Sequence, residues 1–559
     1  MSDYQEARKE VANLIQVHYK ELIRLLYKIK VENSYSSYEI PKKNGSTRVI
    51  YAPNNKLKSI QRNLSQVLYK IHSAYIKKRG IKSRISHGFE PGRTIITNAR
   101  RHRNKKYLLN VDISDFFSSF NFGRVQGFFY KSREFGFSKE VSTIIAQLVC
   151  YKGKLPQGAP TSPIISNLIF NIVDRRILVL AKKYKLDYTR YVDDMSFSTN
   201  SKVFKESYVE FIAELSDLLK NNGFEINHSK TRLEYYSSRQ EVTGLTVNNK
   251  INVSRDFIDK TRAMAHQLYR TNQFYINEEE GKLTQLEGRF SFINQLDWFN
   301  NKYESKIVKN KQSKRYNSGF NVREKQYQYF LFYKYFFKPQ KATIVTEGKT
   351  DILHLKAALM KYCDRYPNLI TKNSDGTYEF KIYFLNKTKR LDFFFGITID
   401  GADSMKNIWN FYNGKSNCYN IFEYLNKKNK EQSTNKANPV ILLFDNEQKN
   451  DKPLKKFLNY INNTLEKNQI SKNLNDNLYL QTIPLVNELE ECEIEDLYQE
   501  DVLEITIDGK NFSKNAKADS VNYFGKHIFS KYIIENYNEI DFSNFIELLD
   551  SINNICEDT

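Results

Sequence analysis

The pattern of apolar and polar positions in the first three hundred residues predicts a mixture of strands and helices. Residues 107–113 (YLLNVDI) form a nearly continuous apolar run with the length of a buried strand. Residues 188–198 (YTRYVDDMSFS) place strand-type residues on both sides of an acidic pair, which predicts a hairpin that reverses at that pair. Residues 161–186, between these segments, have the apolar face of a long helix. We therefore expect a strand, a helix and a hairpin in succession.

The pattern changes after residue 300. Residues 301–326 are charged and poor in apolar residues, which is typical of a connecting segment. Residues 341–359 (KATIVTEGKTDILHLKAAL) predict a strand, a tight turn and a helix, and residues 439–451 (PVILLFDNEQKND) begin with a second buried strand. The expected domains are 1–300, a connector with helices at 301–340, an α/β domain at 341–505 and a helical extension at 506–559.

Charge separates the same two parts of the chain. The net charge is +22, but residues 1–340 carry about +28, whereas residues 341–559 contain 27 basic and 33 acidic residues. The first part is therefore suited to a polyanion such as nucleic acid, with a merely solvated basic surface as the alternative. No apolar run of about 18 residues and no secretory signal occur, so we expect a cytoplasmic protein without a membrane partner.

Three carboxylates from separate segments are expected to meet. Asp112 ends the first buried strand, and Asp193 and Asp194 are the acidic pair of the hairpin. Like charges repel, so such a cluster needs divalent cations, and two Mg²⁺ ions about 4 Å apart can activate a 3′-hydroxyl and hold a triphosphate. Mn²⁺ is the alternative ion. An acidic pair taken alone is also compatible with a solvated turn.

A third motif lies between the two acidic ones. In LPQGAPTSP (155–163), Gly158 permits close approach of the backbone to a substrate. The order of acidic strand, QGxPxSP and YxDD resembles the palm of reverse transcriptases. This resemblance covers roughly residues 1–300 and implies an α+β right-hand polymerase with fingers, palm and thumb, acting as an RNA-directed DNA polymerase.

The resemblance also implies roles for residues around the trio. Phe117, five residues after Asp112, corresponds to the aromatic residue that excludes a ribose 2′-hydroxyl, which implies deoxynucleotide substrates. Gln157 is expected near the incoming nucleotide, Arg48 near its triphosphate and Lys230 near the pyrophosphate. Ordinary solvated cations are the alternative for Arg48 and Lys230.

Two short boxes resemble those of retron-encoded reverse transcriptases. NARRH (98–102) matches an NAxxH box and VTGL (242–245) matches a VTG box, although Val192 stands where these enzymes often carry alanine. The family resemblance implies a prokaryotic protein that binds a cognate non-coding RNA and copies part of it into branched RNA–DNA, the multicopy single-stranded DNA (msDNA). His102 is compatible with RNA contact or with a structural role. The expected RNA-binding residues are Asn98, Arg100, Arg101, His102, Val242, Thr243 and Gly244, with the basic segment 254–272 as a further candidate.

A second acidic site is expected in the α/β domain. Glu347 and Asp445 follow its two predicted strands, and ligands bind at the carboxyl ends of strands in open α/β sheets. With Asp351 and Glu447 they form a candidate site for one or two Mg²⁺ ions. EGKTD and the later DNE resemble a Toprim domain, which implies a metal-dependent nuclease, and Lys526 resembles a lysine that stabilises charge in such nucleases.

Alternatives remain for this second part and for the whole chain. Glu493 and Glu495 are either further ligands or the solvated start of a helix. The Toprim-like domain is either an active effector, which would place the protein in anti-phage defence, or an inactive docking domain. A group II intron-like or diversity-generating reverse transcriptase, or an RNA-binding scaffold, is the alternative to the retron interpretation. Self-association is left open.

Overall fold

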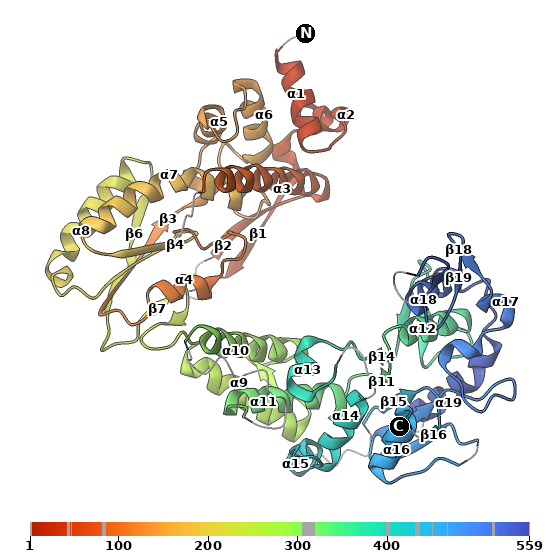
Figure 1. Cartoon of the computed structure of the whole chain (residues 1–559). Helices are drawn as coiled ribbons and strands as arrows, with labels where there is room; N and C mark the ends of the chain where they lie inside the picture. The colour runs from red at the N-terminus through yellow and green to blue at the C-terminus, as the bar shows by residue number, and fades with distance from the viewer. Residues whose placement is uncertain are drawn as a thin grey trace. The chain divides into compact units, whose positions relative to one another are not determined.

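The computed structural model divides the chain into two compact units, residues 1–254 (unit 1) and 255–559 (unit 2). Each unit is considered by itself (Figure 1). No helix in the described part of the chain is long and apolar enough to span a membrane. The structure describes residues 3–41, 45, 47–80, 85–304, 319–398, 403–430, 437–449, 451–466, 468–516 and 520–557.

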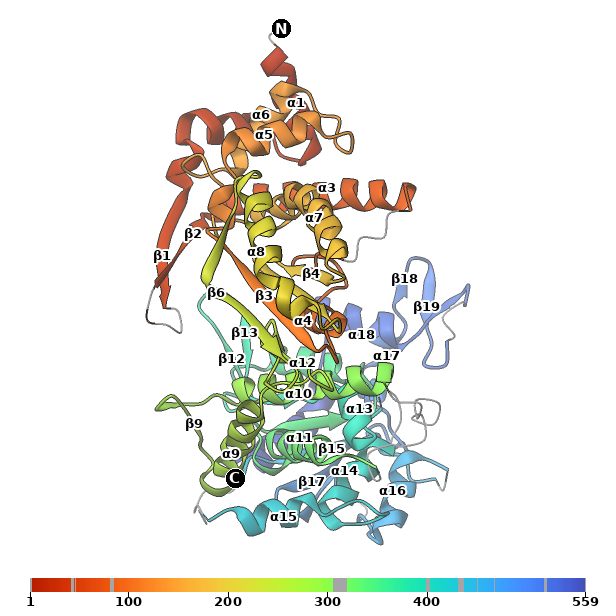
Figure 2. The same ribbon diagram turned by 90° about the vertical axis from the view of Figure 1, so that its left-hand side faces the viewer.

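The centre of unit 1 is a four-stranded antiparallel sheet in the order β4-β5-β3-β6. Its strands are β3 (Tyr107–Ser114), β4 (Asp187–Tyr191), β5 (Asp194–Thr199) and β6 (Glu225–Tyr235). The predicted buried strand and the predicted acidic hairpin are therefore confirmed. Helices α7 (Ser162–Lys183) and α8 (Phe204–Lys220) pack against β4 and β6, respectively, and Figure 2 shows β3 beside β6.

Further helices and a hairpin complete unit 1. The hairpin of β1 and β2 leads into the long helix α3, which Asn54 caps by accepting a hydrogen bond from the Leu57 amide. Helix α6 packs against α1 and α5. The bounds are α1 (Asp3–Leu14), α2 (Tyr19–Ile23), β1 (Tyr35–Pro41), β2 (Thr47–Pro53), α3 (Asn55–Lys78), α4 (Ile95–Arg101), α5 (Phe122–Lys131), α6 (Lys139–Val149), β7 (Glu241–Val242) and β8 (Leu245–Thr246).

Unit 2 begins with helices that pack around an aromatic core. Helices α9 (Arg255–Thr271), α10 (Leu283–Glu304) and α11 (Val322–Phe332) contact one another in the pairs α9–α10 and α10–α11. Tyr327 and Phe330 of α11 are fully buried, so the described part of the expected connector belongs to this core rather than to an exposed linker. The division at residue 254 is earlier than the boundary expected near residue 300. Residues 305–318 lie outside the described residues.

The sheet of unit 2 has the order β14-β11-β15-β17-β16, with only β16 antiparallel to its neighbour. Along β15 the side chains alternate between two cores, with Leu442 on one face and Ile441 on the other. Burial on both faces explains the continuous apolar run and gives the expected α/β architecture. The bounds are β11 (Thr343–Thr346), β14 (Tyr383–Phe384), β15 (Val440–Phe444), β16 (Ser471–Asn475) and β17 (Leu478–Thr482).

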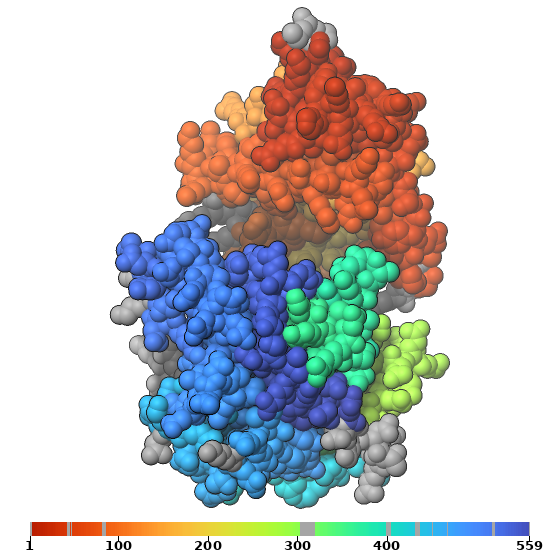
Figure 3. All heavy atoms as spheres, turned by 90° about the vertical axis from the view of Figure 1, so that its right-hand side faces the viewer, coloured from red at the N-terminus to blue at the C-terminus, as the bar shows by residue number. Residues whose placement is uncertain are grey.

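Helices lie on both sides of this sheet, and the end of the chain covers one side. Helix α12 (Asp351–Lys361) packs against α18 (Lys526–Glu535), and Figure 3 shows the turquoise segment after β11 against the blue C-terminal segments. The C-terminal part also contains a small sheet, which the expected helical extension did not include. The remaining elements are β9 (Tyr275–Ile276), β10 (Glu279–Glu280), β12 (Ile370–Lys372), β13 (Tyr378–Phe380), α13 (Lys389–Phe395), α14 (Asp403–Asn413), α15 (Ile421–Lys428), α16 (Pro453–Ile461), α17 (Glu500–Leu503), β18 (Thr506–Ile507), β19 (Lys510–Phe512), β20 (Tyr523–Phe524) and α19 (Ile546–Glu557).

Candidate active sites

The antiparallel sheet of unit 1 brings the three expected carboxylates to one place. Asp112 on β3 pairs directly across from Asp194, the first residue of β5. The Ile113 amide donates a hydrogen bond of 3.1 Å to the Asp193 carbonyl oxygen, so the turn lies against the end of β3. Backbone pairing therefore fixes all three residues relative to one another.

The turn between β4 and β5 is held in an uncommon backbone conformation. Val192 has a φ of 61°, which is costly for a β-branched residue and is kept only where surrounding contacts enforce it. One such contact is Gly88, where an added Cβ atom would lie 2.8 Å from the Val192 nitrogen. Gly88 therefore lets a neighbouring segment press against the acidic turn.

A buried ion pair supports the same turn. Arg190 is fully buried and pairs with Asp174 of α7 at 2.8 Å. The Arg190 guanidinium also donates to the Val192 carbonyl oxygen at 2.9 Å and to the Asn167 side chain at 3.2 Å. Tyr188 donates its hydroxyl to Asp174. This network connects helix α7 to the acidic turn. It was not predicted from the sequence, although the charged Asp174 within the apolar face of that helix was a signal.

The charges of the trio interact strongly. Burial, together with the neighbouring Asp193 and Asp112, raises the pKa of Asp194 to about 6. Burial also raises the pKa of Asp193. Lys230 on β6 donates to Asp112 at 2.9 Å, and Asn227 donates to the same carboxylate oxygen at 3.1 Å. Lys230 thus provides the positive charge beside Asp112, and oxygen donors of this kind fit Mg²⁺ or Mn²⁺.

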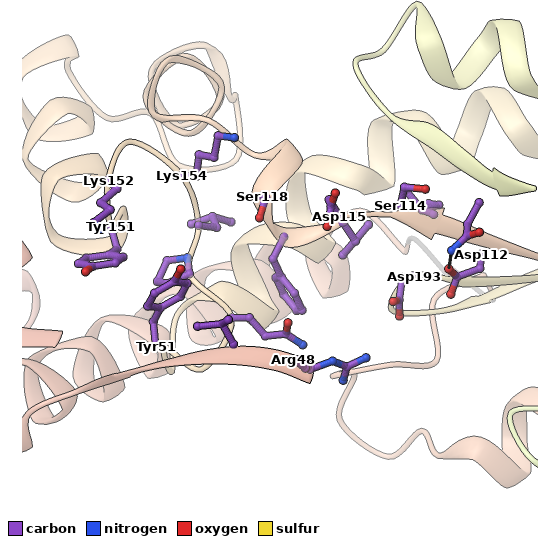
Figure 4. A pocket seen from close by; sticks show the side chains of 18 of the residues that line it. Arg48, Tyr51, Asp112, Ser114, Asp115, Ser118, Tyr151, Lys152, Lys154 and Asp193 are labelled. Carbon is purple, nitrogen blue, oxygen red and sulfur yellow. Dashed lines mark hydrogen bonds between the residues drawn. The ribbon is translucent and has the colours of Figure 1, made fainter. Parts of the chain in front are cut away.

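A polar cavity of about 610 Å³ opens beside the trio. Phe117, Gln157 and Lys230 line it together with Asp112 and Asp193. Figure 4 shows Arg48 at the end of the cavity near Asp193, and Tyr51, Tyr151, Lys152 and Lys154 at the other end. The residues expected to surround an incoming nucleotide therefore lie around one space that ends at the carboxylates.

Gly158 has a different surrounding from the one expected. Its φ is 125°, and an added Cβ atom would lie 2.6 Å from the Tyr51 carbonyl oxygen. The neighbouring Gln157 carbonyl accepts a hydrogen bond of 2.8 Å from the Tyr51 amide. The close approach that requires glycine is thus to strand β2, and it places Gln157 in the cavity, while the expected approach to a substrate stays a prediction.

The NAxxH box corrects one expectation about RNA contacts. Asn98 and His102 are fully buried. His102 shares hydrogen bonds with Ser198 on β5 at 2.8 Å and with Thr189 on β4 at 2.6 Å, and Thr189 donates to Asn98 at 2.5 Å. Burial lowers the pKa of His102 to about 3. These two side chains therefore hold α4 on the sheet and do not face solvent, whereas Arg100 and Arg101 are exposed.

The VTG box forms a tight hairpin beside the NAxxH helix. Thr243 and Gly244, the two residues between β7 and β8, have φ values of 47° and 79°, as a type I′ turn requires. Val242 is fully buried, which corrects its expected RNA contact, while Gly244 is exposed. Both β7 and β8 pack against α4. The NAxxH and VTG boxes, which are far apart in the sequence, thus pack against each other through α4 and the β7–β8 hairpin.

The parallel sheet of unit 2 brings Glu347 and Asp445 together. They follow neighbouring strands β11 and β15, and the Asp445 amide donates to the Glu347 carboxylate at 3.2 Å. Burial and the nearby Asp351 and Glu447 raise the pKa of Glu347 to about 7. The pKa of Asp445 lies well above its ordinary value, through burial and through Glu347. Asp351 accepts a hydrogen bond of 2.9 Å from the Gly348 amide at the start of α12.

A second group of acids surrounds Asp445. Asp445, Glu447 and Glu493 each offer a carboxylate oxygen within 4.8 Å of the others and could hold a metal ion. Among the described residues no other group, the trio of unit 1 included, meets this spacing. Glu495 is 1% exposed, and one of its oxygens has no hydrogen-bond partner among the described residues. Glu493 caps the start of the short helix Ile494–Leu497 and is half-buried, so the helix-start alternative fits this residue, whereas it does not fit the buried Glu495. An orphaned buried carboxylate oxygen beside three clustered ligands fits a divalent cation.

Lysines provide the positive charge in this acidic group. Lys526 donates to Glu495 at 3.0 Å and to Glu493 at 3.2 Å. Burial alone would lower the pKa of Lys526, but the two carboxylates raise it above its ordinary value. Lys514 pairs with Glu493 at 3.4 Å, and Lys452 pairs with Glu447. Lys526 therefore lies among the acids, and its role in stabilising charge stays a prediction. The sequence did not indicate Lys452 or Lys514.

Comparison with known proteins identifies relatives of the first part of the chain. The family model of reverse transcriptases (RNA-dependent DNA polymerases) matches residues 40–248. The chain is 32% identical over 281 residues to the retron Ec86 reverse transcriptase of Escherichia coli, covering 50% of this chain and 81% of that protein. It is 31% identical to the retron Mx65 reverse transcriptase and 34% identical to the retron Mx162 reverse transcriptase, both of Myxococcus xanthus.

The chain spans about 60% of the length of the two Myxococcus relatives that it matches. The alignments cover 47% of this chain in both Myxococcus cases, and 61% and 58% of those relatives' own lengths. Among solved structures, telomerase from Candida albicans in complex with a telomeric RNA fragment matches at 13% identity and a TM-score of 0.32, covering 54% of this chain and 60% of that one. A TM-score this low supports no inference about function.

Proposed function

Because the chain belongs to the retron reverse transcriptases, we propose that residues 1–300, which are unit 1 and the first helices of unit 2, form an RNA-directed DNA polymerase that copies part of a cognate non-coding RNA into branched msDNA. The observation that supports this most is the pairing of Asp112 with Asp194 beside a cavity of about 610 Å³. A basic first part of about +28 suits the polyanionic RNA.

The residues around the cavity have separate tasks in this proposal. Asp112, Asp193 and Asp194 would hold two Mg²⁺ ions, and bound Mg²⁺ would supply Lewis-acid activation of a hydroxyl and neutralise pyrophosphate charge. Arg48 binds the triphosphate of a deoxynucleotide, and Phe117 leaves no room for a ribose 2′-hydroxyl. Lys230, which is bonded to Asp112 and lines the cavity, is the cation nearest to hand for the leaving pyrophosphate.

RNA recognition uses the exposed part of the two retron boxes. Arg100, Arg101 and Gly244 are accessible to phosphates, while the buried Asn98, His102 and Val242 hold the layer that presents them. The cognate non-coding RNA and the msDNA product are thus the partners that we propose, in the cytoplasm of a prokaryote.

Primer extension and sequencing of bound nucleic acid test this function. The purified chain should extend a primed RNA template with deoxynucleotides when Mg²⁺ or Mn²⁺ is present. Asp193→Asn should abolish extension, while Asp217→Asn on the exposed side of α8 should not. Co-purified branched RNA–DNA supports the retron interpretation. Linear RNA alone would favour the group II intron-like or diversity-generating alternative, and extension unaffected by Asp193→Asn would contradict the assigned site.

For unit 2 the acidic group supports a second, metal-dependent activity. We propose that Glu347, Asp351, Asp445 and Glu447, with Glu493 and Glu495 as further ligands, hold one or two divalent cations that activate water for phosphodiester cleavage, as the Toprim resemblance implies. Lys526 stabilises negative charge at the phosphate. The orphaned oxygen of the buried Glu495 is the observation that favours this over an inactive docking domain.

Cleavage assays with matched variants test the second activity. The chain should cleave nucleic acid with Mn²⁺ or Mg²⁺, and Glu347→Gln should remove cleavage while leaving primer extension intact. Glu535→Gln, an exposed residue of α18, is the control. In cells, the two activities together would act in anti-phage defence, with the msDNA complex restraining the nuclease. Glu347→Gln cells that die as wild type does after infection would contradict this effector role.

A further inference from the structure

The helical part of unit 2 contains a pocket that neither proposed activity uses. Helix α15 packs against both α9 and α11, and a cavity of about 570 Å³ lies among these helices. Tyr269, Tyr329 and Tyr424 line it, with Phe290 as a further aromatic residue. We call this cavity the tyrosine pocket.

Aromatic rings form one wall of the tyrosine pocket and continue to the surface. The Tyr329 ring lies 4.9 Å from the Tyr424 ring, and Tyr419 stacks on Tyr329 at 5.8 Å with an interplanar angle of 27°. Tyr419 is 55% exposed, and Tyr329 and Tyr424 are half-buried. A group of aromatic rings that reaches the surface is typical of a site that binds a partner.

A buried hydroxyl at the base of the pocket points to a polar ligand. Tyr269 is 6% exposed, and its hydroxyl has no hydrogen-bond partner among the described residues. An unsatisfied buried polar group costs about 1–3 kcal/mol, so a native structure that keeps one often uses it. A ligand with an apolar face and a polar edge matches this wall and this hydroxyl.

Positive charge surrounds the opening. Arg262 and Lys325 line the pocket, and the Lys428 ammonium lies 5.7 Å from the centre of the Tyr424 ring. His266 also lines the pocket, but burial and the nearby Lys428 and Arg270 lower its pKa, so it adds no positive charge at neutral pH. Asp259 is the one acidic residue among the described lining, and it is already paired with Arg255 at 3.6 Å and with Arg262 at 3.8 Å. The ligand is therefore expected to carry negative charge next to its flat face.

We propose that the tyrosine pocket takes one unpaired nucleobase of a single-stranded nucleic acid, with the adjoining phosphates on Arg262 and Lys325. Flat aromatic faces, hydrogen-bonding edges and a phosphate on each side are combined in a nucleotide strand, and stacking on aromatic side chains binds any base. The inference does not depend on either catalytic site. RNA and DNA strands share this chemistry, so the experiment has one arm for each.

Photo-crosslinking of the full chain tests the proposal. Twelve-residue RNA and DNA oligonucleotides, each with one internal 5-iodouracil, are irradiated with the protein, and crosslinked peptides are mapped by mass spectrometry. We expect crosslinks at Tyr329 or Tyr424 in at least one arm, and the arm that reacts identifies the strand. Crosslinks confined to residues outside the tyrosine pocket in both arms overturn the proposal.

Variants distinguish base stacking from a general loss of structure. Tyr329→Ala and Tyr424→Ala should each reduce crosslinking at the remaining tyrosine by roughly 10-fold. Tyr424→Phe should retain most of it, because the ring remains. Tyr523→Ala, which removes an exposed tyrosine of β20, is the control. Unchanged crosslinking in both alanine variants, with melting temperatures equal to wild type, overturns the proposal. If the alanine variants have a lower melting temperature than wild type, the Tyr424→Phe variant is the deciding test. Loss of crosslinking in that variant also overturns the proposal.

Discussion

The two acidic sites of this protein are built on opposite kinds of sheet. In unit 1 an antiparallel hairpin supplies Asp193 and Asp194 from one turn, and the neighbouring strand supplies Asp112. In unit 2 parallel strands each supply one residue at their carboxyl ends, Glu347 and Asp445. An antiparallel turn therefore places two adjacent carboxylates in a single motif, whereas a parallel sheet must collect its carboxylates from distant parts of the sequence.

The sites also differ in the cations that compensate their charge. One lysine, Lys230, is bonded to the trio of unit 1, and its side chain is 58% exposed. In unit 2, Lys452, Lys514 and Lys526 all pair with the acids around Asp445. The carboxylates of unit 2 thus have more lysine partners than those of unit 1, because an uncompensated buried charge is costly. A metal ion bound at the proposed sites would have to displace more lysine contacts in unit 2 than in unit 1.

The largest expected effect tests whether the two sites act independently. Asp112→Asn should reduce primer extension by about 10³-fold, since it removes a charge that is needed where the metals bind. The metal-dependent cleavage that we propose for unit 2 should stay within twofold of wild type. The comparison is made by assaying both activities on one preparation. Loss of both activities, with an unchanged melting temperature, would show that the sites are coupled.

A large stability effect is expected from the ion pair behind the acidic turn. Arg190→Met leaves the buried Asp174 without its partner and should lower the free energy of unfolding by about 3–5 kcal/mol. Asp174→Leu together with Arg190→Met should restore part of this loss, because no charge then remains buried. Urea unfolding measures both variants. A single variant as stable as wild type would contradict the role assigned to the pair.

A pH effect of intermediate size is expected from the buried His102. Its pKa in the folded protein is about 3, against an ordinary value of 6.5, so the unfolded chain binds the proton first as the pH falls. Stability is therefore fully present above pH 6.5 and should decline by about 1.4 kcal/mol per pH unit from there toward pH 3. His102→Gln should flatten this part of the profile of melting temperature against pH. The exposed His527→Gln serves as control and should leave it unchanged.

The smallest expected effect concerns Lys230, the lysine that is bonded to Asp112 in unit 1. Lys230→Met should raise the apparent affinity for Mg²⁺ by about threefold, since a partly exposed ion pair with Asp112 contributes at most about 1 kcal/mol. The maximal rate of extension should fall at the same time, because the pyrophosphate loses a cation. Titration of Mg²⁺ in the extension assay measures both quantities. A lower Mg²⁺ affinity would mean that Lys230 supports the metal site rather than competing for it.

Local patterns in the sequence determined the main elements and the identity of the acidic residues. Continuous apolar runs are enough to identify β3, β11 and β15, and the YVDD motif predicts its own hairpin because a reversal at two adjacent charges needs no distant information. The meeting of Glu347 with Asp445 also followed from the general behaviour of parallel sheets. The assignments of metals, RNA and both activities stay predictions.

Only the tertiary structure decided what surrounds these residues. Asn98 and His102 look like surface RNA contacts in the sequence, but they are buried because Thr189 and Ser198, about ninety residues away, supply their hydrogen-bond partners. The Arg190–Asp174 pair and the lysines beside Asp445 are equally invisible along the chain. The physical reason is that burial and charge compensation depend on which distant segments pack together, whereas strand and turn formation depends on neighbours in the sequence.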